Sequence, residues 1–275
     1  MILDQFSRQA VPFSTSPGIK DEQALRLIVE FSGAGPEDTV LDVACGGGIV
    51  VCAFARVVRH ATGIDLTPAM IERARSLQAE QGLSNVSWKQ GDVLPLPWPD
   101  GAFSIVTSRF AFHHFLDPRA VLGEMRRVCA PGGKVVVIDT EASPDVAKAA
   151  EFNRMEKLRD PSHVRAMPLA ELRGLFPQAG LPAPRGTNYR LEGELEALLG
   201  RSFPLAGDVL WNPKDPAAPY ALIFDPRRWM RIAAVRSPRF RGWRYLESPP
   251  RSATPSSDEP FDPAGEDGST LPRTS

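Results

Sequence analysis

The chain has 275 residues, 43% of them hydrophobic, which is enough to bury one α/β core of ordinary size and to leave an additional segment. A formal net charge of −1 excludes a global electrostatic field of the kind that attracts nucleic acid or an anionic membrane. No apolar run approaches about 18 residues, and the chain does not start with a basic segment leading into an apolar stretch. We therefore expect a cytoplasmic protein without a membrane span, and we expect its three cysteines, which lack metal-ligand spacing, to be reduced.

The first informative motif is TVLDVACGGGI at residues 39–49, an apolar run that is interrupted only by Asp42 and that leads into three glycines. A strand that ends in a glycine turn and feeds a helix lets backbone N–H groups approach a ligand closely, because glycine has no Cβ. Dehydrogenases and methyltransferases both use such a turn. A carboxylate at Asp42 repels a dinucleotide pyrophosphate and attracts an aminoacyl ammonium group, so the motif favours S-adenosylmethionine over NAD.

Helical and strand patterns alternate after this motif. The predicted helices cover residues 49–58, 68–82 and 117–130, and the predicted strands cover residues 60–66, 86–92, 103–110 and 134–139. This alternation predicts a parallel sheet with right-handed crossovers, and ligands bind such sheets at the carboxyl ends of the strands. The residues at or near those ends, which we treat as one site, are Asp42, Asp65, Asp92, Ser108 and Arg109.

The order of these motifs, from Asp42 to Ile138, resembles the class I S-adenosylmethionine-dependent methyltransferases of the ubiquinone/menaquinone-biosynthesis-like group. The resemblance implies an α/β fold with a doubly wound, Rossmann-like sheet over residues 39–210. It also implies that the acid and glycines of the first motif hold the methionine part of the cofactor, that the acid ending the second strand binds ribose, and that the Gly-Asp pair after the third strand contacts adenine. The implied cofactor-binding residues are Asp42, Ala44, Gly46, Gly48, Asp65, Leu66, Met70, Gly91, Asp92, Val93, Ser108 and Arg109.

Some of these positions allow a second interpretation. Ala44 stands where the family usually has glycine, and its methyl group is expected to narrow the approach to the ligand. Three glycines alone are also typical of a tight strand-to-helix turn, and Asp65 could cap the next helix while it binds ribose. Arg109 has a planar fork suited to a ligand carboxylate, with a surface salt bridge as the alternative.

Residues 108–118, SRFAFHHFLDP, are the best candidate for the floor of an acceptor pocket. Its predicted aromatic walls are Phe110, Phe112 and Phe115. A neutral His113 or His114 could accept a proton during methyl transfer, although tandem histidines also occur as structural residues at helix starts. We favour His114 as the catalytic residue, because the resembled family often has a histidine just before the apolar residue and the Asp-Pro pair.

Two flanking segments are predicted to complete the site. In similar proteins an N-terminal segment folds over the cofactor, so residues 1–38 are expected to form a lid. Phe6 and Phe13 are its candidate cover residues, and packing of their rings against the domain is an equally good interpretation. Residues 159–172, which carry His163, look like an acceptor-side insertion of related methyltransferases.

The end of the chain fits the pattern less well. Residues 186–208 are typical of a strand, a helix and a loop, but the final strand is unclear, with candidates at 220–224 and 230–235. Residues 211–247 are an extension that interleaves arginines with aromatic residues, which could serve nucleic acid, although we regard that partner as the weaker interpretation. Residues 248–275 have the composition of a disordered tail.

Together these features predict an enzyme that transfers a methyl group from S-adenosylmethionine to a small-molecule acceptor by in-line displacement. Because a sulfonium methyl group is already electrophilic, alignment and exclusion of water suffice, and no obligatory nucleophile is needed. A non-catalytic cofactor-binding protein is an alternative suggested by Ala44 and by the atypical end of the chain. An NAD-dependent oxidoreductase is a further alternative that Asp42 disfavours. The acceptor could be a quinone-precursor ring, another phenolic metabolite or a nitrogen heterocycle, and the oligomeric state stays open.

Overall fold

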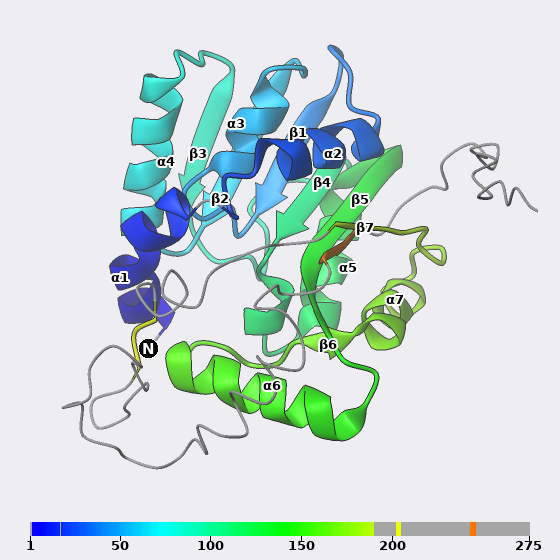
Figure 1. The fold of residues 1–275 in the computed structure, drawn as a ribbon. Helices are drawn as coiled ribbons and strands as arrows, with labels where there is room; N and C mark the ends of the chain where they lie inside the picture. Colours follow the sequence, from blue (N-terminus) through cyan, green and yellow to red (C-terminus); the bar gives the residue numbers. More distant parts are fainter. Residues whose placement is uncertain (1, 17, 190–201, 205–242, 246–275) are drawn as a thin grey trace, which may run out of the picture.

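The structure is a computed structural model that describes residues 2–16, 18–189, 202–204 and 243–245 (Figure 1). The strands are β1 (Thr39–Val43), β2 (His60–Asp65), β3 (Val86–Gln90), β4 (Phe103–Arg109), β5 (Cys129–Ala142), β6 (Met167–Pro168), β7 (Thr187–Tyr189) and β8 (Trp243–Tyr245). The helices are α1 (Ile2–Thr15), α2 (Glu22–Ser32), α3 (Ile49–Ala55), α4 (Pro68–Glu80), the 3₁₀ turn η1 (Phe112–His114), α5 (Pro118–Val128), α6 (Val146–Arg159) and α7 (Leu169–Gln178).

The sheet has the strand order β3-β2-β1-β4-β5-β8-β7, and β6 pairs with β5 outside this path. The five strands from β3 to β5 are parallel to their neighbours, whereas β8 is antiparallel to both β5 and β7. The chain builds outward from β1 through β2 to β3 and then returns to place β4 on the other side of β1. This reversal is the topological switch point at which doubly wound sheets bind ligands, so the predicted fold class is confirmed.

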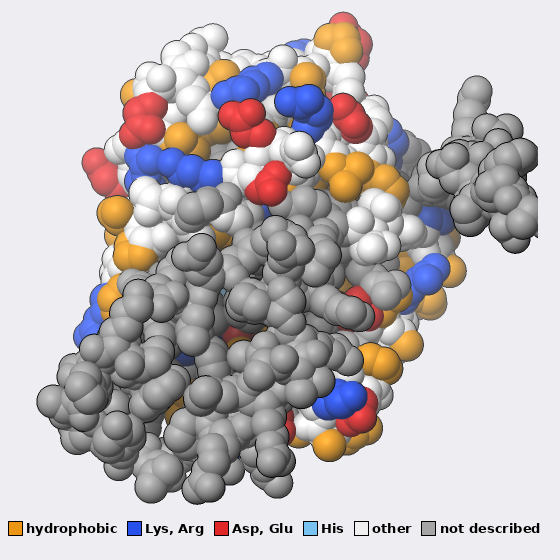
Figure 2. Space-filling model, viewed as in Figure 1, with side chains coloured by type: hydrophobic (Ala, Val, Ile, Leu, Met, Phe, Trp, Pro, Cys, Tyr) orange, Lys and Arg blue, Asp and Glu red, His pale blue; other side chains and the backbone are white. Residues whose placement is uncertain are grey.

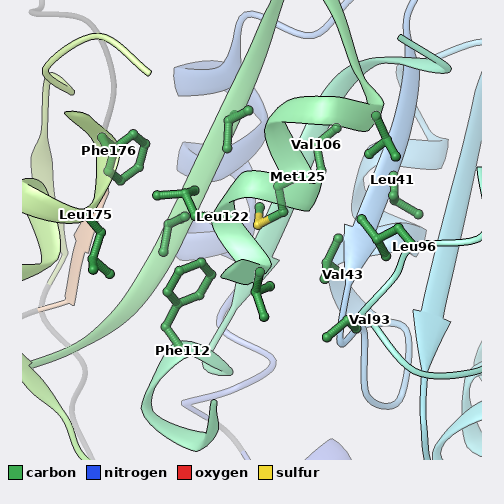
Figure 3. Close-up of a cluster of buried hydrophobic side chains, with 14 of the residues drawn as sticks. Leu41, Val43, Val93, Leu96, Val106, Phe112, Leu122, Met125, Leu175 and Phe176 are labelled. Carbon is green, nitrogen blue, oxygen red and sulfur yellow. The ribbon is translucent and has the colours of Figure 1, made fainter. Parts of the chain in front are cut away.

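Alternate residues of the central strands face opposite sides of the sheet, and each side has its own core. Leu41 and Val43 of β1 join the core beneath α5 and α7, which Figure 3 shows, whereas Val40 joins the core beneath α2 and α3. Both cores are expected from strands that read as nearly continuous apolar runs. In Figure 1, α1 and α6 lie at the end of the sheet where the parallel strands finish.

The N-terminal segment contains two helices that the sequence analysis did not resolve. Asp21 caps α2 by accepting hydrogen bonds from the backbone N–H groups of Gln23 and Ala24, and Gly33 ends the helix with a left-handed φ of 61°. The buried residues of α2 recur every fourth position, which is the pattern of one helical face.

Two boundaries differ from the predictions. Helix α5 ends at Val128 and β5 begins at once, so the Pro-Gly-Gly sequence lies within the irregular start of the strand rather than before it. The register between β4 and β5 shifts there, and a Cβ on Gly133 would lie 2.6 Å from the carbonyl oxygen of Ser104. Only glycine fits so close to a neighbouring backbone.

The strand that pairs antiparallel with β5 is β8, which falls within the predicted extension at residues 211–247. The candidates at 220–224 and 230–235 lie outside the described residues, as does the predicted tail at 248–275. Within the described ranges, no helix combines the length and the apolar character that crossing a membrane requires. On the described part of the face in Figure 2, basic and acidic side chains are interspersed.

The turn between β1 and α3 depends on glycine for space as well as for conformation. Gly48 has a φ of 80°, and a Cβ there would lie 2.5 Å from Cη2 of Trp88 and 2.8 Å from Cβ of Ala74. Trp88 cannot easily move aside, because its Nε1–H donates to Oε1 of Gln78 at 2.7 Å.

We expect Gly48→Ala to lower the free energy of unfolding by about 1–3 kcal/mol more than Gly82→Ala does, as measured by guanidinium titration. Gly82 is a matched control because its φ is 64° while its Cβ direction is open, so its alanine variant suffers only the backbone strain. Equal losses in the two variants would contradict the packing of Trp88 against this turn.

Candidate functional site

The structure brings the predicted strand-end residues of β1, β2 and β4 together at the switch point. Asp42 of β1 pairs in register with Gly63 of β2 on one side and with Thr107 of β4 on the other. Asp65 ends β2, and its charge acts on Asp42 together with that of Arg109. Asp92 lies in the loop after β3 with an exposed side chain, and the preceding Gly91 donates its backbone N–H to the carbonyl oxygen of Asp65 at 3.0 Å.

The glycine turn has a backbone that winds through the left-handed region. The φ values are 57° at Ala44, 50° at Gly46 and 80° at Gly48. A left-handed conformation costs an L-residue roughly 1–2 kcal/mol, which is the physical reason that glycine suits the position of Ala44. The main consequence of alanine in place of glycine at position 44 is therefore backbone strain.

Asp65 joins this turn to the start of α4. One carboxylate oxygen accepts the backbone N–H of Gly46 at 2.9 Å, and the other accepts that of Thr67 at 2.9 Å. Burial raises the pKa of Asp65, and these two N–H groups oppose the shift. Thr67 and not Asp65 is the N-cap of α4, so the capping role that the sequence allowed for Asp65 is not present, although its carboxylate holds the backbone of that cap residue. The oxygen that accepts from Gly46 keeps a lone pair for another donor.

Asp42 is the most unusual group of the site. Its side chain is 1% exposed, and among the described residues its Oδ1 has no hydrogen-bond partner. Burial raises its pKa well above the usual value, and this outweighs the opposing effect of the Arg109 guanidinium. A buried carboxylate oxygen without a partner is rare in folded proteins, and a cationic nitrogen is the ligand group that relieves its cost most fully.

Ser108 and Arg109 hold the elements of the site to each other. The Ser108 hydroxyl donates to the carbonyl oxygen of Val43 at 2.8 Å, which ties β4 to β1. Arg109 donates from Nη1 to the carbonyl oxygen of Ile19 at 3.0 Å, and its Cζ lies 4.2 Å from the centre of the Phe110 ring. The alternative that Arg109 forms a surface salt bridge is wrong, because the residue is 8% exposed.

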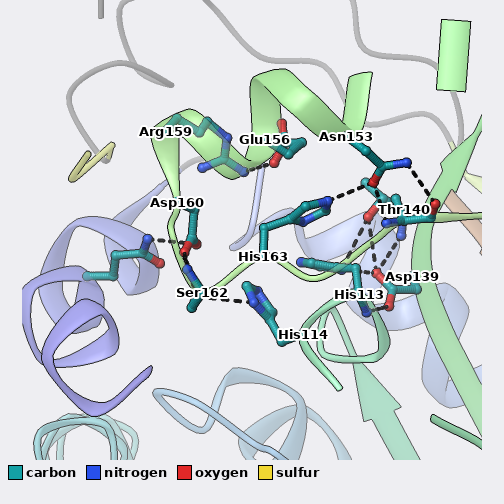
Figure 4. Close-up of polar contacts among 12 residues, drawn as sticks. His113, His114, Asp139, Thr140, Asn153, Glu156, Arg159, Asp160, Ser162 and His163 are labelled. Carbon is teal, nitrogen blue, oxygen red and sulfur yellow. Dashed lines mark hydrogen bonds and ion pairs between the residues drawn. The ribbon is translucent and has the colours of Figure 1, made fainter. Parts of the chain in front are cut away.

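His113 is fixed by a carboxylate that the sequence analysis did not single out. Its Nδ1 lies 2.5 Å from Oδ1 of Asp139, and its backbone N–H donates to Oδ2 of the same residue at 2.9 Å (Figure 4). Burial lowers the pKa of His113, but Asp139 outweighs burial, so the pKa of His113 is raised and that of Asp139 is lowered. Asp139 ends the predicted strand 134–139, a signal of the same kind as Asp65, and could have been found by it.

His114 has a different environment. Its Nδ1 lies 3.2 Å from the hydroxyl oxygen of Ser162, and the edge of the Phe6 ring packs against it with the ring centres 4.9 Å apart. Burial and the neighbouring His113 lower its pKa to about 3, so the imidazole is neutral near pH 7. The pKa values of the two adjacent histidines are therefore shifted in opposite directions.

His163 completes a cluster of three imidazoles. Its ring centre lies 5.4 Å from that of His113 and 6.2 Å from that of His114, although it comes from the loop between α6 and β6. Its Nε2 lies 2.8 Å from Oδ1 of Asn153, and burial lowers its pKa to about 3. The predicted acceptor-side insertion is thus adjacent to the predicted catalytic histidines.

The aromatic residues of the segment 108–118 do not all face the site. Phe112 is 1% exposed and packs in the core beneath α5 and α7, so the prediction that it forms a wall of the acceptor pocket is wrong. Phe115 packs on the same core from its edge and contacts Phe112 with the ring centres 5.4 Å apart. The alternation of apolar and polar residues in this short segment gave no indication of which rings are internal.

Helix α1 contacts both the glycine turn and the histidine cluster. A Cβ on Gly47 would lie 2.2 Å from the hydroxyl oxygen of Ser14, so α1 lies directly on the glycine turn. Further toward its start, Phe6 meets His114 and the Gln9 amide donates to Asp160 at 2.9 Å. Its buried face also includes Gln5, whose Nε2 has no hydrogen-bond partner among the described residues. A helix that buries glutamines faces a polar site rather than an apolar core.

Comparison with known proteins assigns the chain to a family. Residues 41–137 match the family described as "Methyltransferase domain", and the uncharacterized methyltransferase YcgJ of Bacillus subtilis is 35% identical over 171 residues, which are 62% of this chain and 68% of that protein. The chain belongs to this family of S-adenosylmethionine-dependent methyltransferases. A ubiquinone/menaquinone biosynthesis C-methyltransferase, UbiE of Teredinibacter turnerae, is 34% identical over 118 residues, which are 42% of this chain and 47% of that protein.

Solved structures agree with the fold. A crystal structure of a putative methyltransferase from Bacillus halodurans has a TM-score of 0.67 and 28% identity, and the match covers 82% of this chain and 96% of that chain. The crystal structure of YcgJ has a TM-score of 0.63 and 24% identity, with 83% of this chain and 99% of that chain covered. The chain spans about half the length of UbiE, so membership of the family does not assign the activity of that whole protein to this chain.

We expect Asp42→Asn to raise the free energy of unfolding at pH 7 by about 1–3 kcal/mol, because it removes a buried negative charge. The folded-state pKa of Asp42 lies above its unfolded value, so the cost appears as the pH rises above about 4 and is complete above the raised folded pKa. The gain should therefore shrink when thermal unfolding is measured at pH 4.

Asp100→Asn is the control for this comparison, because the Asp100 side chain is 82% exposed. We expect its stability to differ little from that of the wild type at pH 7. A loss of stability in Asp42→Asn at neutral pH would show that the carboxylate is satisfied in the free protein.

Proposed function

We propose that this methyltransferase acts on a small-molecule acceptor, and that the residues at the switch point hold S-adenosylmethionine. The observation that carries the cofactor assignment is the buried, unpartnered Oδ1 of Asp42, which suits the ammonium group of the methionine part. The turn at Gly46 and Gly48 places backbone beside that part, and the remaining lone pairs of Asp65 suit the ribose hydroxyls. Gly91 and Asp92 are the proposed adenine contacts.

The cofactor, when bound, supplies an electrophilic methyl group on sulfur. The chain itself would orient the cofactor and exclude water. Asp42 would bind the aminoacyl group and Asp65 the ribose, while α1, the proposed lid, covers the glycine turn through Ser14. His114, neutral near pH 7 and adjacent to α1, accepts the proton that an oxygen or nitrogen acceptor loses.

The acceptor is proposed only as a class. Relatives carry the names of a C-methyltransferase, UbiE, and of a probable tocopherol O-methyltransferase from rice, which is 36% identical over 129 residues, so relatives do not agree on the atom that is methylated. The neutral imidazole of His114 favours an acceptor that must lose a proton, such as a phenol or a ring nitrogen. One observation, the strained backbone at Ala44, supports the alternative that the protein binds the cofactor without turnover.

Calorimetric titration tests the cofactor assignment. We expect the wild type to bind S-adenosylmethionine and S-adenosylhomocysteine at micromolar concentrations, and Asp42→Asn to weaken both by roughly 10–100-fold, because a charge-assisted hydrogen bond is lost. Asp100→Asn should bind as the wild type does. Tighter binding of NAD than of either adenosyl ligand would overturn the proposal.

Transfer of an isotopically labelled methyl group to a panel of phenols, quinone precursors and nitrogen heterocycles tests the reaction. For an acceptor that is methylated, we expect His114→Gln to lower kcat by about 10²–10⁴-fold while the affinity for S-adenosylmethionine stays unchanged. Binding of the cofactor without transfer to any acceptor in the panel would favour the non-catalytic alternative.

A further inference from the structure

A continuous chain of hydrogen bonds connects α1 to His114 (Figure 4). The Gln9 amide donates to Oδ2 of Asp160 at 2.9 Å, the Ser162 hydroxyl donates to Oδ1 of Asp160 at 2.5 Å, and Nδ1 of His114 lies 3.2 Å from the Ser162 hydroxyl oxygen. Gln9, Asp160 and Ser162 are all less than 9% exposed. Three buried polar side chains from α1 and from the loop after α6 thus converge on one imidazole.

The proton positions along this chain follow from its donors. Asp160 accepts from Gln9, from the Ser162 hydroxyl and from the Ser162 backbone N–H at 3.0 Å, so its two oxygens act only as acceptors. Burial raises the pKa of Asp160, whereas the hydrogen bonds from Ser162 and Gln9 and the charge of the Arg159 guanidinium favour its ionised form. The single hydroxyl proton of Ser162 is used on Asp160, so its oxygen can only accept from His114. Nδ1 of His114 must then carry the hydrogen, and the lone pair is on Nε2.

The neighbouring His113 shows what a direct carboxylate contact does instead. Asp139 faces its Nδ1 without an intervening hydroxyl, and the pKa of His113 is raised. The ring centre of His113 lies 4.2 Å from that of His114, and a positive charge on His113 disfavours a second one on His114. The serine hydroxyl thus separates the His114 imidazole from the Asp160 carboxylate, whereas His113 contacts its carboxylate directly.

We propose that Asp160 and Ser162 are positioning residues that hold His114 with Nδ1 protonated and Nε2 free to accept the acceptor's proton, and that Gln9 makes the docking of α1 part of the same chain. This inference rests on the proposed function and names the residues that prepare its base. As the acceptor atom bonds to the methyl carbon, the C–S electron pair stays on sulfur and the acceptor proton passes to Nε2. The resulting imidazolium donates from Nδ1 to Ser162, whose hydroxyl points at the negative charge of Asp160, and later releases the proton to water.

The test is the protonation state of His114 in the full chain, measured by NMR with ¹⁵N-labelled histidine and without cofactor. The chain has four histidines, and His114→Gln assigns the signal. We expect wild-type His114 to be neutral at pH 7 with the hydrogen on Nδ1. Ser162→Ala should convert it largely to the Nε2–H form that free histidine prefers, and Ser162→Thr, which restores a hydroxyl, should return the wild-type form.

Ser143→Ala is the matched control, because within the described part of the chain the Ser143 hydroxyl bonds locally, accepting the backbone N–H of Asp145. Gln9→Leu should leave the Nδ1–H form in place but lower the protection of α1 amides from hydrogen exchange. Hydrogen on Nε2 of wild-type His114, or a Ser162→Ala spectrum like that of the wild type, would overturn the inference. Because this readout needs no cofactor, its failure is distinct from a failure to bind S-adenosylmethionine, which would overturn the proposed function instead.

Discussion

The carboxylate of Asp65 holds the ligand side of this fold together. It accepts one backbone N–H from the glycine turn and one from Thr67, the residue that caps α4, so both elements are fixed to the end of β2. The glycine turn determines where α3 begins, and Ser14 of α1 packs against it. These two hydrogen bonds define the shape of the switch point between β1 and β4, where the buried carboxylate of Asp42 lies ready to bind a cation.

Electrostatics divides the site into two halves of different character. At the switch point, burial raises the pKa values of Asp42 and Asp65, so this half is incomplete until a ligand supplies donors and a positive charge. In the histidine cluster Asp139 raises the pKa of His113, and the lowered pKa of His114 leaves a neutral base beside it. A cationic cofactor and a proton-losing acceptor match these two halves respectively. Helix α1 contacts both, which makes it the element whose movement would open both together.

The sequence predicted the features that repeat a simple rule. Each central strand reads as an apolar run, and an acid or a polar pair at its carboxyl end marks the ligand edge, so the sheet and the positions of Asp42 and Asp65 could be derived from the pattern. The contact of Ser162 with His114 could not, since 48 positions separate them and no local pattern carries such information. The start of β5 was misplaced because Pro-Gly-Gly is usually a terminator, whereas here Gly133 lets the strand pass close to Ser104. Phe112 was placed at the pocket because side-chain direction in a 3₁₀ turn is set by tertiary packing.

The central claim is that the ammonium group of the cofactor donates a hydrogen bond to the unpartnered Oδ1 of Asp42. Its most direct test is the number of protons exchanged on binding of S-adenosylmethionine, obtained by calorimetry between pH 5 and 7 in buffers of different ionisation enthalpy. Because burial holds the pKa of Asp42 well above its usual value and a bound cation would bring it down, the account predicts release of a proton in the wild type and none from this group in Asp42→Asn. Binding with the same proton exchange in both proteins would contradict it.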